Sequence, residues 1–191
     1  EGEARLNKLL DMRRQLEKEL ASCKHVRICP YTEPSKIIIS VKNTNFTGKQ
    51  LYDFLREKYH LQLEMACETY ALAMLSMMDT QEGIRRLVAA LKDIDSESTS
   101  EKAPDFTSVS ECWNPARKLP LYEAYMQESC EVLLRDAIGR TAAEFVNLYP
   151  PGIPLLVPGE RIEEPFVRAI QERIGHGYTV QGINEGKVCV L

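Results

Sequence analysis

The sequence of 191 residues lacks the features of several large functional classes. It carries 24 Lys and Arg against 28 Asp and Glu, so its net charge of −4 offers no basic surplus for contacting nucleic-acid phosphates. No run reaches the roughly 20 apolar residues that cross a bilayer, and the first twenty residues are highly charged rather than signal-like. We therefore expect no nucleic-acid partner, no membrane partner, and a soluble cytoplasmic chain.

Metal and common catalytic motifs are also missing. The six cysteines form no Cys-x-x-Cys pair and show no regular spacing, which predicts neither a zinc site nor a disulfide framework but mostly buried thiols in a reducing compartment. There is no Walker loop, no Gly-x-Ser-x-Gly elbow and no His-Glu-x-x-His helix. The scattered His25, His60 and His176 are better explained as surface or packing residues than as catalysts or ligands.

The first segment with a clear pattern is an amphipathic helix. Residues 3–22 place leucines in a matrix of Arg, Lys and Glu, at positions 6, 9, 10, 16 and 20. This leucine stripe needs a partner. Packing within the chain or against another domain is favoured over a short coiled coil, because the heptad pattern is not sustained.

The next segment predicts a small α/β sandwich. Residues 36–41 and 70–76 read as strands, and residues 61–65 alternate as a strand with one wet face does. Capping boxes at 47–50 and 79–82 introduce two helices whose apolar positions recur at helical spacing: Leu51, Leu55 and Tyr59 in the first, and Ile84, Leu87, Val88, Leu91 and Ile94 in the second. The order strand, helix, strand, strand, helix predicts an open sheet with helices on one face.

A second mixed α/β domain is expected after a polar linker at 95–104. We expect a helix over 121–138 capped by Gly139, a strand at 145–149, and a helix starting at Pro165 and ending at Gly175. The inward residues of this last helix are predicted to be Phe166, Ile170 and Ile174. Residues 178–183 and 187–191 look like a hairpin around 184–186. The predicted fold class is therefore α/β (α+β), a small sandwich followed by a second mixed domain.

A stretch at 148–160 holds four of the ten prolines and two glycines. Proline fixes φ and glycine permits tight turns, so this segment should follow a stiff, defined path. Such a path suits the wall of a ligand site, because ordering it costs no further entropy on binding. A rigid connector between two strands is the simpler alternative.

The same stretch carries a resemblance to a known family. Residues 136–144 (DAIGRTAAE), 149–160 (YPPGIPLLVPGE) and 123–125 (EAY) resemble the C-terminal domain of the bacterial ornithine/lysine/arginine decarboxylases, which are pyridoxal-phosphate enzymes of the aminotransferase-like fold. The resemblance divides the chain into a linking helix (1–30), a small domain (31–95), a linker (96–120) and the decarboxylase C-terminal domain (121–191).

This resemblance also implies what is missing from the segment. The family binds pyridoxal phosphate through a lysine in a Ser-x-His-Lys motif of its large domain. No histidine here precedes a lysine, so we expect these 191 residues to hold no catalytic residue and neither to bind the cofactor covalently nor to decarboxylate. The expected partners are the missing cofactor domain, further copies in a homodimer or higher homo-oligomer, and a basic amino acid that could be ornithine, lysine or arginine.

Within a complete enzyme, the proline stretch would form an active-site wall that helps closure and substrate selection. Its candidate residues are Glu144, Tyr149, Pro150, Pro151, Gly152 and Glu160. Either carboxylate could pair with the distal cation of the substrate. Alternatively each could cap backbone or pair with Arg140 or Arg161, and Thr141 and Glu144 themselves match a capping box. The alternative function is a free-standing, non-enzymatic module for small-molecule binding or assembly.

Overall fold

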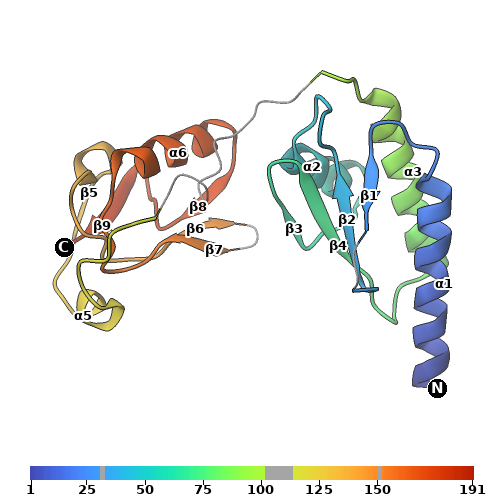
Figure 1. Cartoon of the computed structure of the whole chain (residues 1–191), viewed down its shortest axis with the longest axis horizontal. Coiled ribbons are helices and arrows are strands. Elements are labelled where there is room, and N and C mark those ends of the chain that lie inside the picture. Colours follow the sequence, from blue (N-terminus) through green and yellow to red (C-terminus); the bar gives the residue numbers. More distant parts are fainter. Residues whose placement is uncertain (31–32, 102–113, 150–151) are drawn as a thin grey trace. The chain divides into compact units, whose positions relative to one another are not determined.

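The computed structural model describes residues 1–30, 33–101, 114–149 and 152–191, and it divides the chain into two compact units (Figure 1). The first unit spans Glu1–Asp105 and the second Phe106–Leu191. Each unit has its own hydrophobic core. None of the helices in the described ranges combines the length and apolar character that crossing a bilayer requires.

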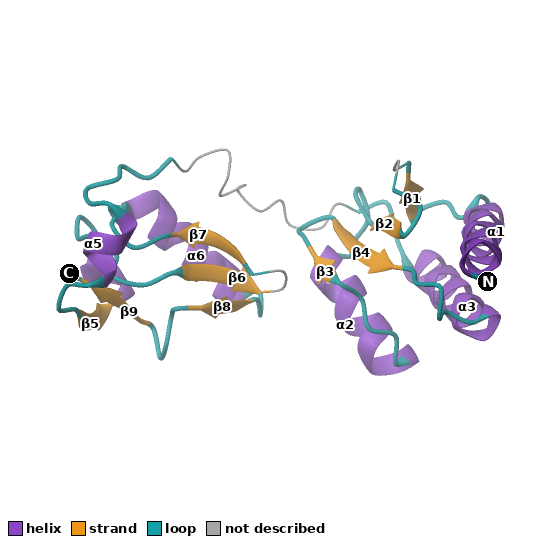
Figure 2. Cartoon of the chain, turned by 90° about the horizontal axis from the view of Figure 1, so that it is seen from below, coloured by secondary structure: helices purple, strands orange, loops and turns teal. Residues whose placement is uncertain are grey.

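The first unit is a four-stranded antiparallel sheet with three helices. Its strands run in the order β1-β2-β4-β3, and Figure 2 shows the helices together on one side of them. The elements are α1 (Gly2–Leu20), β1 (Arg27–Cys29), β2 (Lys36–Ser40), α2 (Gly48–Tyr59), β3 (Met65–Ala66), β4 (Tyr70–Met74) and α3 (Gln81–Glu97). The mixed α/β class and the one-sided sandwich are thus confirmed. Strand β1 was not predicted, since three residues carry too little pattern.

The leucine stripe of α1 is covered by the unit itself. Leu9, Leu16 and Leu20 are buried, and α1 packs against α3 and β1. Only the amino-terminal turns stand clear, where Leu6 remains 49% exposed. Packing within the chain therefore explains most of the stripe without a coiled-coil partner.

The helix starts follow local side-chain chemistry. The capping box at Thr47 and Gln50 forms with both of its hydrogen bonds. The second helix begins one residue later than predicted, because Thr80 rather than Asp79 is the N-cap and accepts the Gly83 N–H at 3.1 Å. The helix also continues to Glu97, into the predicted linker, whose later residues 102–113 lie outside the described ranges.

Two further expectations need correction, one for a strand of this unit and one for the cysteines of both units. The strand predicted over 61–65 is reduced to Met65–Ala66, since only these residues pair with β4. The cysteines are not mostly buried: Cys130 is exposed, and the other free thiols in the described ranges are half-buried. Cys112 falls outside the described residues.

The second unit contains two antiparallel sheets, β5-β9 and β7-β6-β8, and α6 packs against β8 of the second sheet. Its elements are α5 (Leu121–Tyr125), β5 (Cys130–Leu133), the 3₁₀ helix η1 (Leu134–Ala137), β6 (Val146–Tyr149), β7 (Ile153–Leu156), α6 (Glu164–Gly175), β8 (Thr179–Gln181) and β9 (Lys187–Val190). Its core includes Val146, Leu156 and Phe166, all fully buried.

The helix predicted over 121–138 was wrong beyond its first turns. It ends at Tyr125, and residues 130–133 pair with β9 instead, Val132 lying opposite Val188. Cross-strand pairing with a distant segment overrides the helical spacing of the apolar residues. Ile138, the last residue of the predicted helix, is 44% exposed.

The predicted carboxy-terminal hairpin was also wrong. Strand β8 pairs with β6 and β9 pairs with β5, so the two segments belong to different sheets. The turn itself exists, with reciprocal backbone hydrogen bonds between Asn184 and Lys187. In α6, Pro165 lies in the first turn as expected and Phe166 and Ile170 are buried, but Ile174 is 43% exposed.

Candidate functional site

The first half of the proline stretch forms the β6–β7 hairpin. Leu148 and Ile153 lie opposite each other, and the Gly152 N–H donates to the Leu148 carbonyl at 2.8 Å. Gly152 has a φ of +91°, a conformation that side chains rarely adopt. Pro150 and Pro151 lie outside the described residues. The hairpin end presents Tyr149, 50% exposed, and Ile153, 58% exposed.

The second half of the stretch is a tight turn held by its own glutamate. The Glu160 carboxylate accepts the Val157 N–H at 2.9 Å, and the Glu160 N–H donates to the Val157 carbonyl at 3.2 Å. Gly159 has a φ of +91°, and a Cβ there would lie 2.3 Å from the Leu119 carbonyl oxygen. Glu160 therefore caps the backbone of its own turn, which is the structural alternative to substrate binding that the sequence suggested for it.

Glu144 lies in a different chemical setting. It is exposed, and its carboxylate hydrogen-bonds the Cys189 thiol on β9. Burial, followed by the charge and hydrogen bond of Glu144, raises the pKa of that thiol. The capping box expected at Thr141 and Glu144 does not form, because Thr141 and Ala142 make backbone bridges to Arg161 and Val190 in place of a helix.

Arg140 and Arg161, which the sequence suggested as ion-pair partners of Glu144 and Glu160, do not pair with either carboxylate in the described ranges. The Arg140 guanidinium donates to the Leu191 carbonyl at 2.8 Å and to the Cys130 sulfur at 3.6 Å. Arg161 is exposed, and no ion pair joins it to Glu144 or Glu160 within the described ranges. Each carboxylate therefore has one partner, the Cys189 thiol for Glu144 and the Val157 N–H for Glu160, but Glu144 is exposed whereas Glu160 is half-buried.

The structure brings the two motif segments together through their backbones. Gly139 N–H donates to the Ile162 carbonyl at 2.8 Å, and Ile162 N–H donates to the Arg140 carbonyl at 2.9 Å. Ala142 N–H donates to the Glu160 carbonyl at 2.8 Å, so segments 139–142 and 159–162 run side by side. Sequence reasoning missed this ladder, because isolated backbone pairing leaves no hydrophobic alternation to detect.

A pyridoxal-phosphate site is not supported by the residues present. Covalent binding requires a lysine held in a protected site, and every lysine in the described ranges is exposed or half-buried. The same ranges contain no group of three His, Cys, Asp or Glu side chains able to hold a metal ion. His60 and His176 occupy the C-cap positions of α2 and α6.

Comparison with known proteins matches this chain to one family of decarboxylases. Residues 114–174 match the model of the Orn/Lys/Arg decarboxylase C-terminal domain. The arginine decarboxylase of Halalkalibacterium halodurans is 37% identical over 153 residues, covering 78% of this chain and 31% of the relative. That of Bacillus anthracis is 30% identical over 196 residues, covering 95% of this chain and 39% of the relative.

Solved structures extend the similarity of fold across the chain. The lysine decarboxylase LdcF of Francisella novicida aligns with a TM-score of 0.73 and 16% identity, covering 99% of this chain and 40% of that one. The constitutive lysine decarboxylase of E. coli gives 0.72 and 13%, with coverages of 99% and 40%. The chain spans only about a third of the length of the curated relatives. Residues 114–174 therefore form an Orn/Lys/Arg decarboxylase C-terminal domain, and the chain corresponds to the C-terminal part of an Orn/Lys/Arg decarboxylase-like protein.

Proposed function

We propose that this chain serves as the C-terminal part of a pyridoxal-phosphate-dependent decarboxylase of a basic amino acid, with arginine the favoured substrate. The carrying observation is the match of residues 114–174 together with 37% identity to an arginine decarboxylase. In such enzymes the bound cofactor supplies the electron sink for loss of carbon dioxide. The residues described here would act without covalent contact to it, by shaping and closing the active site.

The partner for this role is the cofactor-binding large domain. The sheet face of the first unit that its helices leave open carries apolar side chains: Ile38 lies opposite Leu72, which also lies opposite Met65, and Met74 is 49% exposed. An antiparallel sheet with a solvated second face normally presents polar residues there. This open face therefore supports docking of a further domain, and a homodimer or higher homo-oligomer would bury additional surface.

Within that complete site, Glu144 is the stronger candidate for binding the substrate cation. Glu144 is exposed and its partner is a thiol, a weak hydrogen-bond donor, whereas the half-buried Glu160 holds the backbone N–H of Val157 in a tight turn. A carboxylate can accept two parallel hydrogen bonds from a guanidinium. Tyr149 and Gly152 lie at the opposite end of β6 from Glu144, so with Pro150 and Pro151 they would form a separate part of the wall, while Glu160 keeps its own turn in shape.

Steady-state kinetics of the complete enzyme test this assignment. Glu144→Gln should raise KM for arginine about tenfold, the equivalent of roughly 1.4 kcal/mol of binding, with a smaller change in kcat. Glu160→Gln should mainly lower the melting temperature. Glu185→Gln, in the exposed turn before β9, is the matched control and should change neither. An unchanged KM for Glu144→Gln would reject the assignment.

A non-enzymatic binding module remains the alternative, favoured by one observation. The first unit has a groove of about 590 Å³ of its own between α1 and β1. A volume of this size is typical of ligand sites. If the complete gene product decarboxylates a basic amino acid, the enzyme hypothesis is supported. If a folded gene product shows no such activity, the binding-module hypothesis is supported instead.

A further inference from the structure

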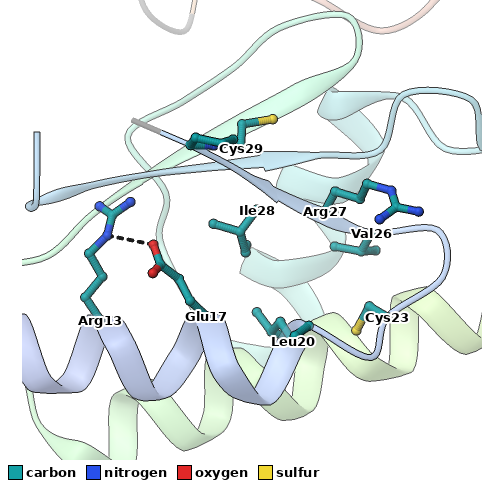
Figure 3. Close-up of a pocket in the computed structure, with 10 residues that line it drawn as sticks. Arg13, Glu17, Leu20, Cys23, Val26, Arg27, Ile28 and Cys29 are labelled. Carbon is teal, nitrogen blue, oxygen red and sulfur yellow. Dashed lines mark hydrogen bonds and ion pairs between the residues drawn. The ribbon is translucent and has the colours of Figure 1, made fainter. Parts of the chain in front are cut away.

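The groove between α1 and β1 has apolar residues at its floor and charged residues at its rim. Leu20, Val26 and Ile28 provide the apolar surface, and Figure 3 shows Ile28 reaching from the strand toward Leu20 on the helix. Arg13, Glu17 and Arg27 also line it, with the Arg13 Nε 2.9 Å from a Glu17 carboxylate oxygen.

Hydrogen bonds hold both walls of the groove in place. The guanidinium of Arg13, a residue only 8% exposed, donates to the carbonyls of Glu33, Pro34 and Lys36 at the start of β2. On the other side, the Asp95 carboxylate of α3 accepts the backbone N–H groups of Lys24, His25 and Val26 at 3.0, 2.7 and 2.8 Å. The groove is therefore preformed, and a ligand would not have to order it.

Strand β1 borders this groove with an open hydrogen-bonding edge. It pairs only with β2, with Arg27, Ile28 and Cys29 opposite Ser40, Ile39 and Ile38. On its outer side no residue of the described ranges pairs with it. Alternate residues of an edge strand direct their N–H and C=O groups outward, so this edge can accept another strand. Pro30 follows directly and lacks an N–H, which limits the pairing to three residues.

An open edge beside a helix, with an apolar gap between them, is the geometry used in peptide recognition by strand addition. Side chains alternate along β1: Ile28 faces α1, while Cys29 points to the other side of the sheet (Figure 3). An added strand would follow the same alternation. In the added strand, the side chain of the residue beside Ile28 would enter the gap over Leu20. The side chains of the residues before and after it would lie on the other face of the sheet, beside Arg27 and Cys29.

The charges at the rim select the kind of peptide. Arg27 is exposed, and within the described ranges its guanidinium makes only a long hydrogen bond of 3.5 Å to the Lys24 carbonyl. The negative charge of Glu17 is already matched by Arg13. We infer that the α1–β1 groove binds an extended peptide as a fifth strand of the sheet, with an apolar side chain in the gap and a carboxylate beside Arg27.

Peptide titration of the 191-residue chain, followed by backbone amide NMR, tests this inference. The probe is an acetylated and amidated pentapeptide of alternating Asp and Ile, which should shift the amides of residues 27–29. Replacing its Asp residues with Lys should weaken binding about tenfold, the equivalent of roughly 1.4 kcal/mol. Two N-methylated versions, blocking alternate sets of N–H groups, should differ, because only one set faces the strand edge.

Charge reversal in the protein provides the matched comparison. Arg27→Glu should weaken binding of the acidic peptide about tenfold and improve binding of the Lys peptide. Arg14→Glu, at an exposed position of α1 outside the groove lining, should change neither; melting curves verify that both variants fold. The inference is overturned if residues 27–29 do not shift or if both N-methylated peptides bind equally. It is also overturned if light scattering shows a dimer and the amides of residues 27–29 shift on dilution, which would place the second copy at β1.

Discussion

Asp95 fixes the loop between α1 and β1, and its removal should destabilise the first unit measurably. Its carboxylate accepts three backbone N–H groups, from Lys24, His25 and Val26. Hydrogen bonds to charged groups contribute about 1.5–3 kcal/mol each, with less expected where solvent competes. Since Val26 is 1% exposed, its N–H would be left without an acceptor. We expect Asp95→Ala to lower the free energy of unfolding by about 2–4 kcal/mol.

The pH dependence of this effect has a defined sign. Burial raises the pKa of Asp95, but the backbone N–H groups of Val26, Lys24 and His25 outweigh it, so the net shift is downward. A lowered folded-state pKa stabilises the fold above the unfolded value of about 3.9, and this stability is lost as pH falls through the folded value. The difference between wild type and Asp95→Ala should therefore be full at neutral pH and shrink in acid.

Urea denaturation followed by circular dichroism, at pH 7 and at pH 3, measures both quantities. Asp95→Asn keeps one carbonyl oxygen and should cost less than Asp95→Ala. Ala89→Ser, at an exposed position of the same helix, serves as a control that leaves the loop untouched. A loss below about 0.5 kcal/mol for Asp95→Ala, the range of ordinary surface substitutions, would refute the reasoning.

Three other substitutions and one ligand test follow from the structure. Gly48→Ala would place its Cβ 2.2 Å from the Cys67 carbonyl oxygen, so calorimetry should show a lower melting temperature for the first unit. Thr47→Ala removes the cap of α2 and should cost about 1 kcal/mol in chemical denaturation. Phe166→Ala, at a fully buried position, should cost the second unit about 3–5 kcal/mol. Pyridoxal phosphate added to the 191-residue chain should give no stable aldimine absorbance band, and the appearance of such a band would contradict this expectation.

The parts of the fold that sequence could predict are those with local causes. The helix at 48–59 combines a capping box with a single apolar face, and both signals lie within a few residues of each other. The strand predicted over 70–76 from a compact apolar run also formed, as the shorter β4 at Tyr70–Met74. Such elements need little information from the rest of the chain.

The failures share a dependence on distant partners. Residues 130–133 form a strand because residues 187–190 pair with them, and no local pattern announces that pairing. For the same reason the two segments predicted to form a hairpin do not pair with each other: β8 pairs with β6, and β9 pairs with β5. At the candidate site, the proline motif was recognised, but the backbone ladder between 139–142 and 159–162 emerged only from the structure.

The most direct test of the central claim is release of carbon dioxide by the complete product of the gene that encodes these 191 residues. The protein would be purified with pyridoxal phosphate and assayed with labelled arginine, lysine and ornithine. Our account predicts release from a basic amino acid, fastest from arginine. No release from any of the three, by a folded protein, would contradict it.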